Sequence, residues 1–309
     1  MRFGEVRVVP VNGYGPEDTL VDADGQVYTG LADGRIIRIS QDGRRIDAVA
    51  DTGGRPLGLE FYGDELLVCD AYRGLLVVSP ADGAVRTLTR EVAGRPMVFC
   101  NNAAVAADGT VYFSDSSARF PITHWRDDLI EQTGSGRLLR RGPDGAIDEL
   151  AGGLQFANGV ALSADESFVT VAETGDCRVR RVWLTGERAG STDVFADGLA
   201  GHPDNTSTGS DGLIWVTQAS PRVAALDMVR RLPGALRALV RRLPTSVQPS
   251  PARTCGVLGI DSEGTIVHDL SGEVSGFHML TGVRERDGVL YFGSLEERSI
   301  AITTVPVRS

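Results

Sequence analysis

Short apolar runs with β-strand character recur along the whole chain, and turn residues separate them. The runs QVYTG, LLVCD, TVYFS, FVTVAE, LIWVT and VLYFG are rich in β-branched and aromatic residues, whereas stretches with helical periodicity are nearly absent. Asp-Gly or a related pair adjoins most of these runs, as in ADGQVYTG and ADGTVYFS. Asp-Gly favours tight hairpin turns because such turns need residues with positive φ. The pattern therefore predicts an all-β, mostly antiparallel fold.

The turns also repeat along the chain. When one turn per unit is aligned, the units are marked by Asp24, Asp64, Asp108, Asp165, Asp211 and Asp287. Six units over 309 residues correspond to about 50 residues each, the size of a propeller blade. We therefore predict a six-bladed β-propeller that occupies residues 1–309 as a single domain; the competing architecture is a two-domain β-sandwich. The N-terminal strand in MRFGEVRVVPV is expected to pair with IAITTVPV and close the ring.

Oxygen-bearing side chains share one position of this repeat. Seven residues before the aligned aspartates stand Glu17, Leu57, Asn101, Asn158, Asp204 and Leu280. Equivalent positions of a propeller lie at one height around its axis, so the two acids and two asparagines of this set are expected to meet in the central channel. Carboxylate and amide oxygens suit Ca²⁺, with Mg²⁺, Mn²⁺ or Zn²⁺ as alternatives. The competing interpretation is that each Asn or Asp starts its strand through an Asx turn.

The motifs NNAAVAADGTVYFSDSS, FANGVALSADESFVTVAET and HPDNTS resemble those of the strictosidine-synthase-like family. This family belongs to the superfamily of gluconolactonases and paraoxonases. The resemblance implies a six-bladed propeller with a divalent cation, usually calcium, in its tunnel, and its hydrolytic members open lactones or aryl esters. Matched position by position, the metal ligands that the resemblance implies are Glu17, Asn101, Asn158 and Asp204, with Asn205 as a further candidate, and a second calcium would fall on Asp18 and Asn102.

The chain departs from the family pattern at catalytic positions. Plant strictosidine synthases carry a Glu in the last blade, and Thr281 stands at the matching position. Paraoxonases carry a pair of histidines, and the matching positions hold Leu57 and Ala71. The resemblance therefore implies neither alkaloid condensation nor the paraoxonase histidine pair.

The function that these residues favour is calcium-dependent hydrolysis of lactones or aryl esters, with the metal polarising the carbonyl. The alternative is a non-hydrolytic propeller that binds a small molecule or acts as a lyase or cyclase. Candidates for the base that activates water are Asp204, Asp70, His202 and His124. We expect His202 at the surface, because alternate residues at a strand start need not both face the tunnel.

Two insertions interrupt the repeat, at residues 118–136 and 222–253. The second has apolar positions at helical spacing, broken at Pro233-Gly234, and several arginines: Arg230, Arg231, Arg237, Arg241 and Arg242. We predict a short helical cap over the tunnel with a solvated polar face. The alternative is contact of residues 222–243 with a membrane surface or an acidic partner.

The overall charge narrows the range of partners. With 31 basic and 41 acidic residues, the net charge is −10, so we expect a small-molecule substrate and no nucleic acid. The N-terminus has no long apolar region, and the interpretation is a cytoplasmic protein without a transmembrane segment. Four cysteines without CxxC spacing are expected to be free, buried thiols.

Overall fold

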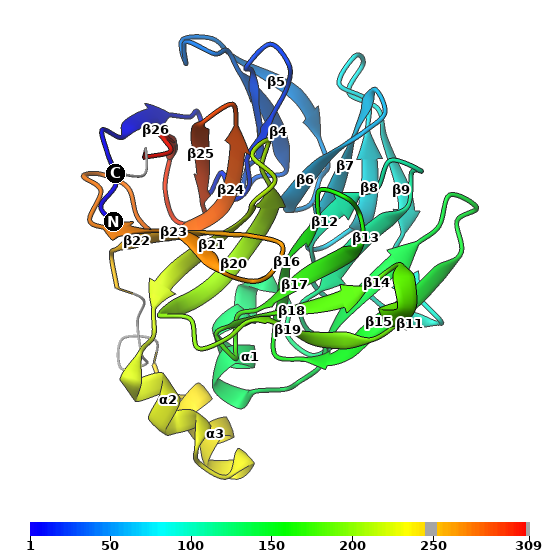
Figure 1. The fold of residues 1–309 in the computed structure, drawn as a ribbon, viewed down its shortest axis with the longest axis vertical. Helices are drawn as coiled ribbons and strands as arrows, with labels where there is room; N and C mark the ends of the chain where they lie inside the picture. Colours follow the sequence, from blue (N-terminus) through cyan, green and yellow to red (C-terminus); the bar gives the residue numbers. More distant parts are fainter. Residues whose placement is uncertain (245–251, 307–309) are drawn as a thin grey trace.

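The computed structural model, which describes residues 1–244 and 252–306, has six four-stranded antiparallel sheets arranged around a central axis (Figure 1). The prediction of an all-β, six-bladed β-propeller is confirmed. A short, separate hairpin of β10 (Glu91–Val92) and β11 (Arg95–Pro96) follows the last strand of the second blade. Asp-Gly turns connect strands as expected, and Gly25, Gly109 and Gly288 in these turns have positive φ.

The first three blades each contain four consecutive strands. Blade 1 consists of β2 (Leu20–Val21), β3 (Val27–Gly30), β4 (Arg35–Ile39) and β5 (Ile46–Asp51). Blade 2 consists of β6 (Pro56–Tyr62), β7 (Glu65–Asp70), β8 (Gly74–Val78) and β9 (Val85–Thr89). Blade 3 consists of β12 (Cys100–Val105), β13 (Val111–Asp115), β14 (Gly136–Arg141) and β15 (Ile147–Leu154).

The fourth and fifth blades follow the same order. Blade 4 consists of β16 (Ala157–Leu162), β17 (Phe168–Glu173), β18 (Arg178–Trp183) and β19 (Thr192–Ala196). Blade 5 consists of β20 (Gly201–Thr208), β21 (Ile214–Pro221), β22 (Cys255–Ile260) and β23 (Ile266–Gly272). In each blade the first strand is innermost, so the residues that begin it lie closest to the axis.

The sixth blade joins the two ends of the chain. It contains β24 (Leu280–Arg286), β25 (Val289–Ser294), β26 (Ser299–Thr304) and, as its outer strand, β1 (Arg7–Pro10). β1 pairs antiparallel with β26, with Arg7 opposite Ile302 and Pro10 opposite Ser299. The expected ring closure is therefore confirmed, and it gives the last blade's outer edge a hydrogen-bonded partner.

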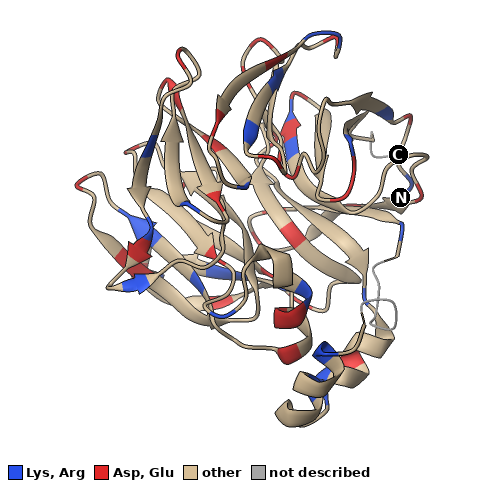
Figure 2. Cartoon of the chain, turned by 180° about the vertical axis from the view of Figure 1, so that it is seen from behind, with Lys and Arg blue, Asp and Glu red and all other residues tan. Residues whose placement is uncertain are grey.

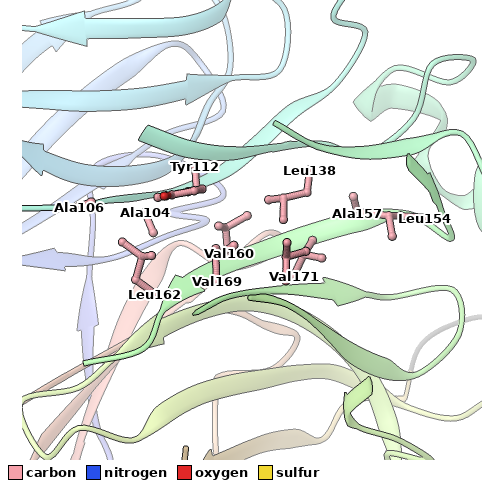
Figure 3. Close-up of a cluster of buried hydrophobic side chains, with 11 residues drawn as sticks. Ala104, Ala106, Tyr112, Leu138, Leu154, Ala157, Val160, Leu162, Val169 and Val171 are labelled. Atoms are coloured by element: carbon pink, nitrogen blue, oxygen red, sulfur yellow. The ribbon is translucent and has the colours of Figure 1, made fainter. Parts of the chain in front are cut away.

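The hydrophobic core is divided among the contacts between neighbouring blades. Figure 3 shows one such cluster, in which Leu138 of β14 packs between blades 3 and 4 against Val160 of β16 and Val171 of β17. Similar clusters join the other neighbouring blades. Because a blade is covered on both faces, strands such as β7 and β8 are buried almost throughout, which explains their continuous apolar sequences.

The helices lie in the two predicted insertions, apart from η2 (Gly186–Arg188). The first insertion forms η1 (Ile122–His124) and α1 (Trp125–Glu131), and the second forms α2 (Ala224–Arg230) and α3 (Gly234–Arg241). Residues 245–251 of the second insertion lie outside the described residues. No helix among the described residues is long and apolar enough to cross a membrane. The four cysteines are free and buried, as expected.

Candidate metal centre

Two consecutive residues of each innermost strand are displaced from regular pairing. In β12, Cys100 pairs with Asp115 and Ala103 with Phe113, so two residues oppose one on the neighbouring strand. The same irregularity occurs in β6, β16, β20 and β24, and in blade 1 the equivalent residues immediately precede β2. A β-bulge of this kind changes the direction in which side chains point. The bulges thus create two rings of residues around the axis.

The first residues of the bulges form what we call the axial ring. Its members, all of which line one cavity, are Glu17, Leu57, Asn101, Asn158, Asp204 and Thr281. The expectation that Leu280 takes the sixth position is wrong by one residue. Asp287 in blade 6 is the first residue after Arg286, the last residue of β24 that pairs with β25, whereas Asp64 in blade 2 is the second residue after Tyr62, the last paired residue of β6. Counting seven residues back from the aspartate therefore ends one residue too early in blade 6.

Four oxygen atoms around the axis are buried without a hydrogen-bond partner. They are Glu17 Oε2, Asn101 Oδ1, Asn158 Oδ1 and Asn205 Oδ1. All four are acceptors, and leaving a buried acceptor unpaired costs about 1–3 kcal/mol. Buried polar groups normally have a partner, so a cluster of unpaired acceptors points to a positively charged ligand. The donor set therefore fits a hard divalent cation.

Hydrogen bonds to the amide nitrogens orient these oxygens. Asn101 Nδ2 donates to Ser116 Oγ at 2.9 Å, and Asn158 Nδ2 donates to Thr174 Oγ1 at 3.1 Å. Asn205 Nδ2 donates to Glu17 Oε1 at 3.0 Å. Because each amide nitrogen donates a hydrogen bond to another group, the amide oxygen remains available as an acceptor. These supporting hydroxyls, Ser116 and Thr174, could not be predicted from the repeat pattern, because they lie just after the second strand of their blades.

The electrostatics of the ring also favour a bound cation. Burial raises the pKa of Glu17 well above its ordinary range, and repulsion by Asp18 and Asp204 adds to the effect. Burial raises the pKa of Asp204 from 3.8 to about 7. Neither carboxylate forms an ion pair with any residue that the structure describes. Buried carboxylates are normally paired with a cation or coordinate a metal. The Arg55 guanidinium offsets the raised pKa of Glu17 only in part, so the pair still lacks the positive charge that would stabilise both carboxylates.

The second residues of the bulges form the interblade ring, in which polar residues alternate with glycine. Its members are Asp18, Gly58, Asn102, Gly159, Asn205 and Gly282. A Cβ atom on Gly159 would lie 2.2 Å from the Thr206 nitrogen, and one on Gly282 would lie 2.6 Å from Asp18 Cα. Each glycine thus makes room for the polar residue of the next blade.

The oxygens of Asp18 and Asn102 already have backbone partners. Asp18 accepts from the Leu59 nitrogen at 3.1 Å, and Asn102 Oδ1 accepts from the Val160 nitrogen at 2.8 Å. Both bonds join neighbouring blades. Unlike the axial oxygens, these two oxygens already have hydrogen-bond partners in the protein. They therefore give no support to the second calcium that was considered for Asp18 and Asn102.

His202 lies at the cavity rather than at the surface, so the expected surface position is wrong. Its side chain is buried and lines the cavity. Nδ1 contacts the Thr174 carbonyl oxygen at 2.9 Å, which assigns the ring proton to Nδ1, and Nε2 is buried without a partner. Burial lowers the pKa of His202 and favours its neutral form. Strand alternation did not predict the position of His202, because the pairing of β20 is irregular on both sides of Pro203.

The structure does not bring Asp70 or His124 to the cavity lining. Asp70 is buried, but it accepts hydrogen bonds from Thr52 Oγ1 at 2.8 Å and from the Tyr72 and Arg73 nitrogens at 2.9 Å. These bonds close a turn within blade 2. His124 is exposed and contacts Asp127 at 2.9 Å. Among the candidate bases, only Asp204 and His202 therefore face the cavity.

The cavity has a polar floor and apolar walls. The axial ring, Thr174 and His202 form the floor, whereas the walls come from Phe99, Phe156, Met279, Leu295 and helical residues of the cap. The helical residues are Ile122, Trp125, Arg126, Leu129, Ile130, Val223 and Leu226. Both insertions thus contribute side chains to the lining of the cavity. No group of three or more His, Cys, Asp or Glu side chains is placed to share a metal within residues 1–244 and 252–306, so a cation here would depend on amide oxygens.

The fold and the ring of inward oxygen atoms define a six-bladed propeller with a candidate cation site on its axis. The profile described as strictosidine synthase matches residues 101–187, and that of the N-terminal part of strictosidine synthase-like proteins matches residues 4–39. Strictosidine synthase-like protein 10 of Arabidopsis thaliana is 34% identical over 95% of this chain and 86% of its own. The chain therefore belongs to the strictosidine-synthase-like family.

Other relatives and solved structures extend this comparison. An adipocyte plasma membrane-associated protein of Danio rerio is 35% identical over 91% of this chain and 73% of its own. A gluconolactonase from Xanthomonas campestris has a TM-score of 0.70 at 18% identity, covering 99% of this chain and 91% of its own. The calcium-binding protein regucalcin from Agrobacterium tumefaciens has a TM-score of 0.68 at 14% identity, covering 98% and 94%. At these identities the structural likeness establishes the fold alone.

Proposed function

We propose that the protein is a calcium-dependent hydrolase of lactones or aryl esters. The observation that carries this proposal is the set of unpaired buried oxygens of Glu17, Asn101, Asn158 and Asn205 around the axis, together with the Asp204 carboxylate at the cavity floor. These five residues would hold the ion. When bound, calcium supplies a positive charge that polarises a substrate carbonyl and stabilises the oxyanion.

The residues of the chain supply the remaining requirements of hydrolysis. His202 Nε2 has a free lone pair because Nδ1 is engaged by the Thr174 carbonyl oxygen, so it can accept a proton from an attacking water molecule. Asp204 is the alternative proton acceptor. The cap residues Trp125 and Leu129 cover the cavity and exclude bulk water from the carbonyl.

The walls of the cavity indicate the class of substrate. Phe99, Phe156 and Leu226 contribute apolar surface, and Arg126 of α1 is the one charged residue of the lining outside the floor. A sugar lactone would leave most of its hydroxyl groups without partners against such walls. We therefore propose substrates with an apolar body and one carbonyl group that reaches the floor.

A panel of substrates tests this proposal directly. The purified protein is assayed with apolar lactones, aryl acetates and a sugar lactone, with calcium and with EDTA. We expect calcium-dependent turnover of the apolar substrates, a decrease of at least about tenfold in Asn158→Ala, and a decrease in His202→Gln without loss of calcium binding. Turnover that persists in EDTA would contradict the role of the metal.

A second function, small-molecule binding without hydrolysis, is favoured by the composition of the axial ring. Leu57 carries no acid-base group, and the Thr281 hydroxyl donates to the Glu17 carbonyl oxygen at 2.8 Å. Tight calcium binding without turnover of any ester in the panel would favour this second function over the first.

A further inference from the structure

The helical arm of the second insertion exposes a row of apolar side chains. Half of the large apolar side chains that are exposed in the described residues fall between residues 228 and 243: Met228 65%, Leu232 37%, Leu236 46%, Leu239 59% and Leu243 44%. The spacing of the leucines follows one stripe along α3 and the turn before it. α3 has no buried residue, so this stripe does not belong to the core of the protein.

Three arginines of the arm, Arg230, Arg237 and Arg241, face α1 rather than solvent. Arg241 contacts Glu131 at 2.5 Å and Asp127 at 3.5 Å, and Arg237 donates to Gln132 at 3.3 Å. Arg230 donates to the Leu129 carbonyl oxygen at 3.1 Å. The charged stripe therefore packs on α1, and the apolar stripe faces outward. The prediction of a solvated polar face is wrong for α3.

The arm also carries positive charge beside the apolar stripe. Residues 222–243 contain six arginines and one aspartate, in a chain with a net charge of −10. Arg231 directly after α2 and Arg242 directly after α3 are exposed and form no ion pair with a described residue. Figure 1 shows α2 and α3 projecting from the body of the propeller, and Figure 2 shows basic residues on this arm.

We propose that this arm docks the protein on an anionic lipid surface. The apolar stripe, defined by Met228, Leu232, Leu236, Leu239 and Leu243, would enter the interface, and the exposed arginines would contact lipid phosphates. An exposed apolar stripe flanked by arginine is typical of helices that lie in a membrane interface. This proposal does not depend on hydrolytic activity.

The size and chemistry of the stripe favour a lipid over a protein partner. Stable protein interfaces involve about 20–30 residues on each side, far more than one projecting helix offers. The stripe also lacks the Trp and Tyr anchors that dominate protein interfaces. Because Val223 and Leu226 at the base of the same arm line the cavity, docking would place the cap of the cavity at the lipid surface.

Vesicle co-sedimentation of the full chain tests the proposal. The probes are vesicles of phosphatidylcholine alone and of phosphatidylcholine mixed with phosphatidylglycerol. We expect binding to the mixed vesicles, weakened by salt, and a loss of at least about tenfold in partitioning for Leu236→Glu/Leu239→Glu. Arg231→Gln/Arg242→Gln should reduce binding by a smaller factor. The matched control is Ile266→Glu, which changes a side chain of similar exposure, 46%, on β23 and should bind as the wild type does.

The outcomes that overturn the proposal are distinct. Wild-type protein that stays in the supernatant with mixed vesicles contradicts it, as does a leucine variant that binds equally well. A dimer that Leu236→Glu/Leu239→Glu converts to a monomer in analytical ultracentrifugation would assign the stripe to a second copy of the chain. Binding that depends on the two arginines but not on the leucines would indicate a purely ionic partner. Circular dichroism checks folding, and Leu236→Ser/Leu239→Ser replaces the glutamate variant if that variant unfolds.

Discussion

The axial ring and the interblade ring are built from adjacent residues of the same bulges, yet their polar groups are used differently. Asn101 in the axial ring has a buried oxygen without a partner, whereas the oxygen of Asn102 accepts a hydrogen bond from the Val160 nitrogen. Asp18 likewise accepts from the Leu59 nitrogen. The axial ring has acceptors available for a ligand, whereas Asp18 and Asn102 of the interblade ring hold the blades together; Asn205 is the exception, because its oxygen has no partner. Residue type alone does not distinguish them; the hydrogen-bond partners do.

The largest effect is expected from filling the space that the interblade ring leaves open. In Gly159→Ala the new Cβ would lie 2.2 Å from the Thr206 nitrogen and 2.6 Å from Asn205 Cα. Because these are backbone atoms of the next blade, we expect the free energy of unfolding to fall by about 3 kcal/mol. Denaturant unfolding measures this. The control is Gly4→Ala, whose new Cβ would have its nearest atom, Thr303 Oγ1, at 4.0 Å; equal stability of the two variants would contradict the close-packing argument.

The next effect concerns calcium affinity. Asn158→Ala removes one of the unpaired oxygens, so we expect calcium affinity to fall by about tenfold or more. The calcium-free protein should lose no more than about 1 kcal/mol, because the lost oxygen has no partner and only the hydrogen bond from Asn158 Nδ2 to Thr174 Oγ1 is removed. Isothermal titration calorimetry and thermal unfolding in EDTA measure the two quantities. A variant that binds calcium as the wild type does would remove Asn158 from the ligand set.

The converse result is expected in the interblade ring. Asn102→Ala leaves the buried Val160 nitrogen without its acceptor, so we expect stability to fall by about 1–3 kcal/mol. Calcium affinity should change less than in Asn158→Ala. If Asn102→Ala instead abolished calcium binding and left stability unchanged, the assignment of the two rings would be reversed.

The last effect is a dependence of stability on pH in the calcium-free protein. Burial raises the pKa of Asp204 from 3.8 to about 7 in the folded state, so the folded protein holds a proton that the unfolded chain has already released. Stability in EDTA should therefore fall as the pH rises between these values. Unfolding midpoints measured across this range should show a weaker slope in Asp204→Asn. An identical slope in that variant would assign the pH dependence to other groups.

Much of the fold and part of the site could be predicted from the sequence because both follow local rules. Asp-Gly turns marked the blades, and a constant distance from the turn identified Asn101 and Asn158. The same rule failed at Leu280, because Asp287 is the first residue of its hairpin loop whereas Asp64 is the second, so Thr281 rather than Leu280 reaches the axis. Where a loop begins depends on how the strands pair, which the sequence pattern did not reveal.

Long-range contacts account for the remaining errors. His202 reached the cavity because the pairing of β20 is irregular beside Pro203, and strand alternation alone cannot anticipate this. The outward apolar face of α3 depends on Glu131, which binds Arg241 from 110 positions away in the chain. Such pairings are set by the assembled fold rather than by local sequence.

A crystal structure determined with calcium tests the central claim most directly. The account predicts one ion on the axis, with Glu17, Asp204 and the amide oxygens of Asn101, Asn158 and Asn205 as ligands at about 2.4 Å. Electron density that shows these oxygens hydrogen-bonded to water, with no ion among them at saturating calcium, would contradict it.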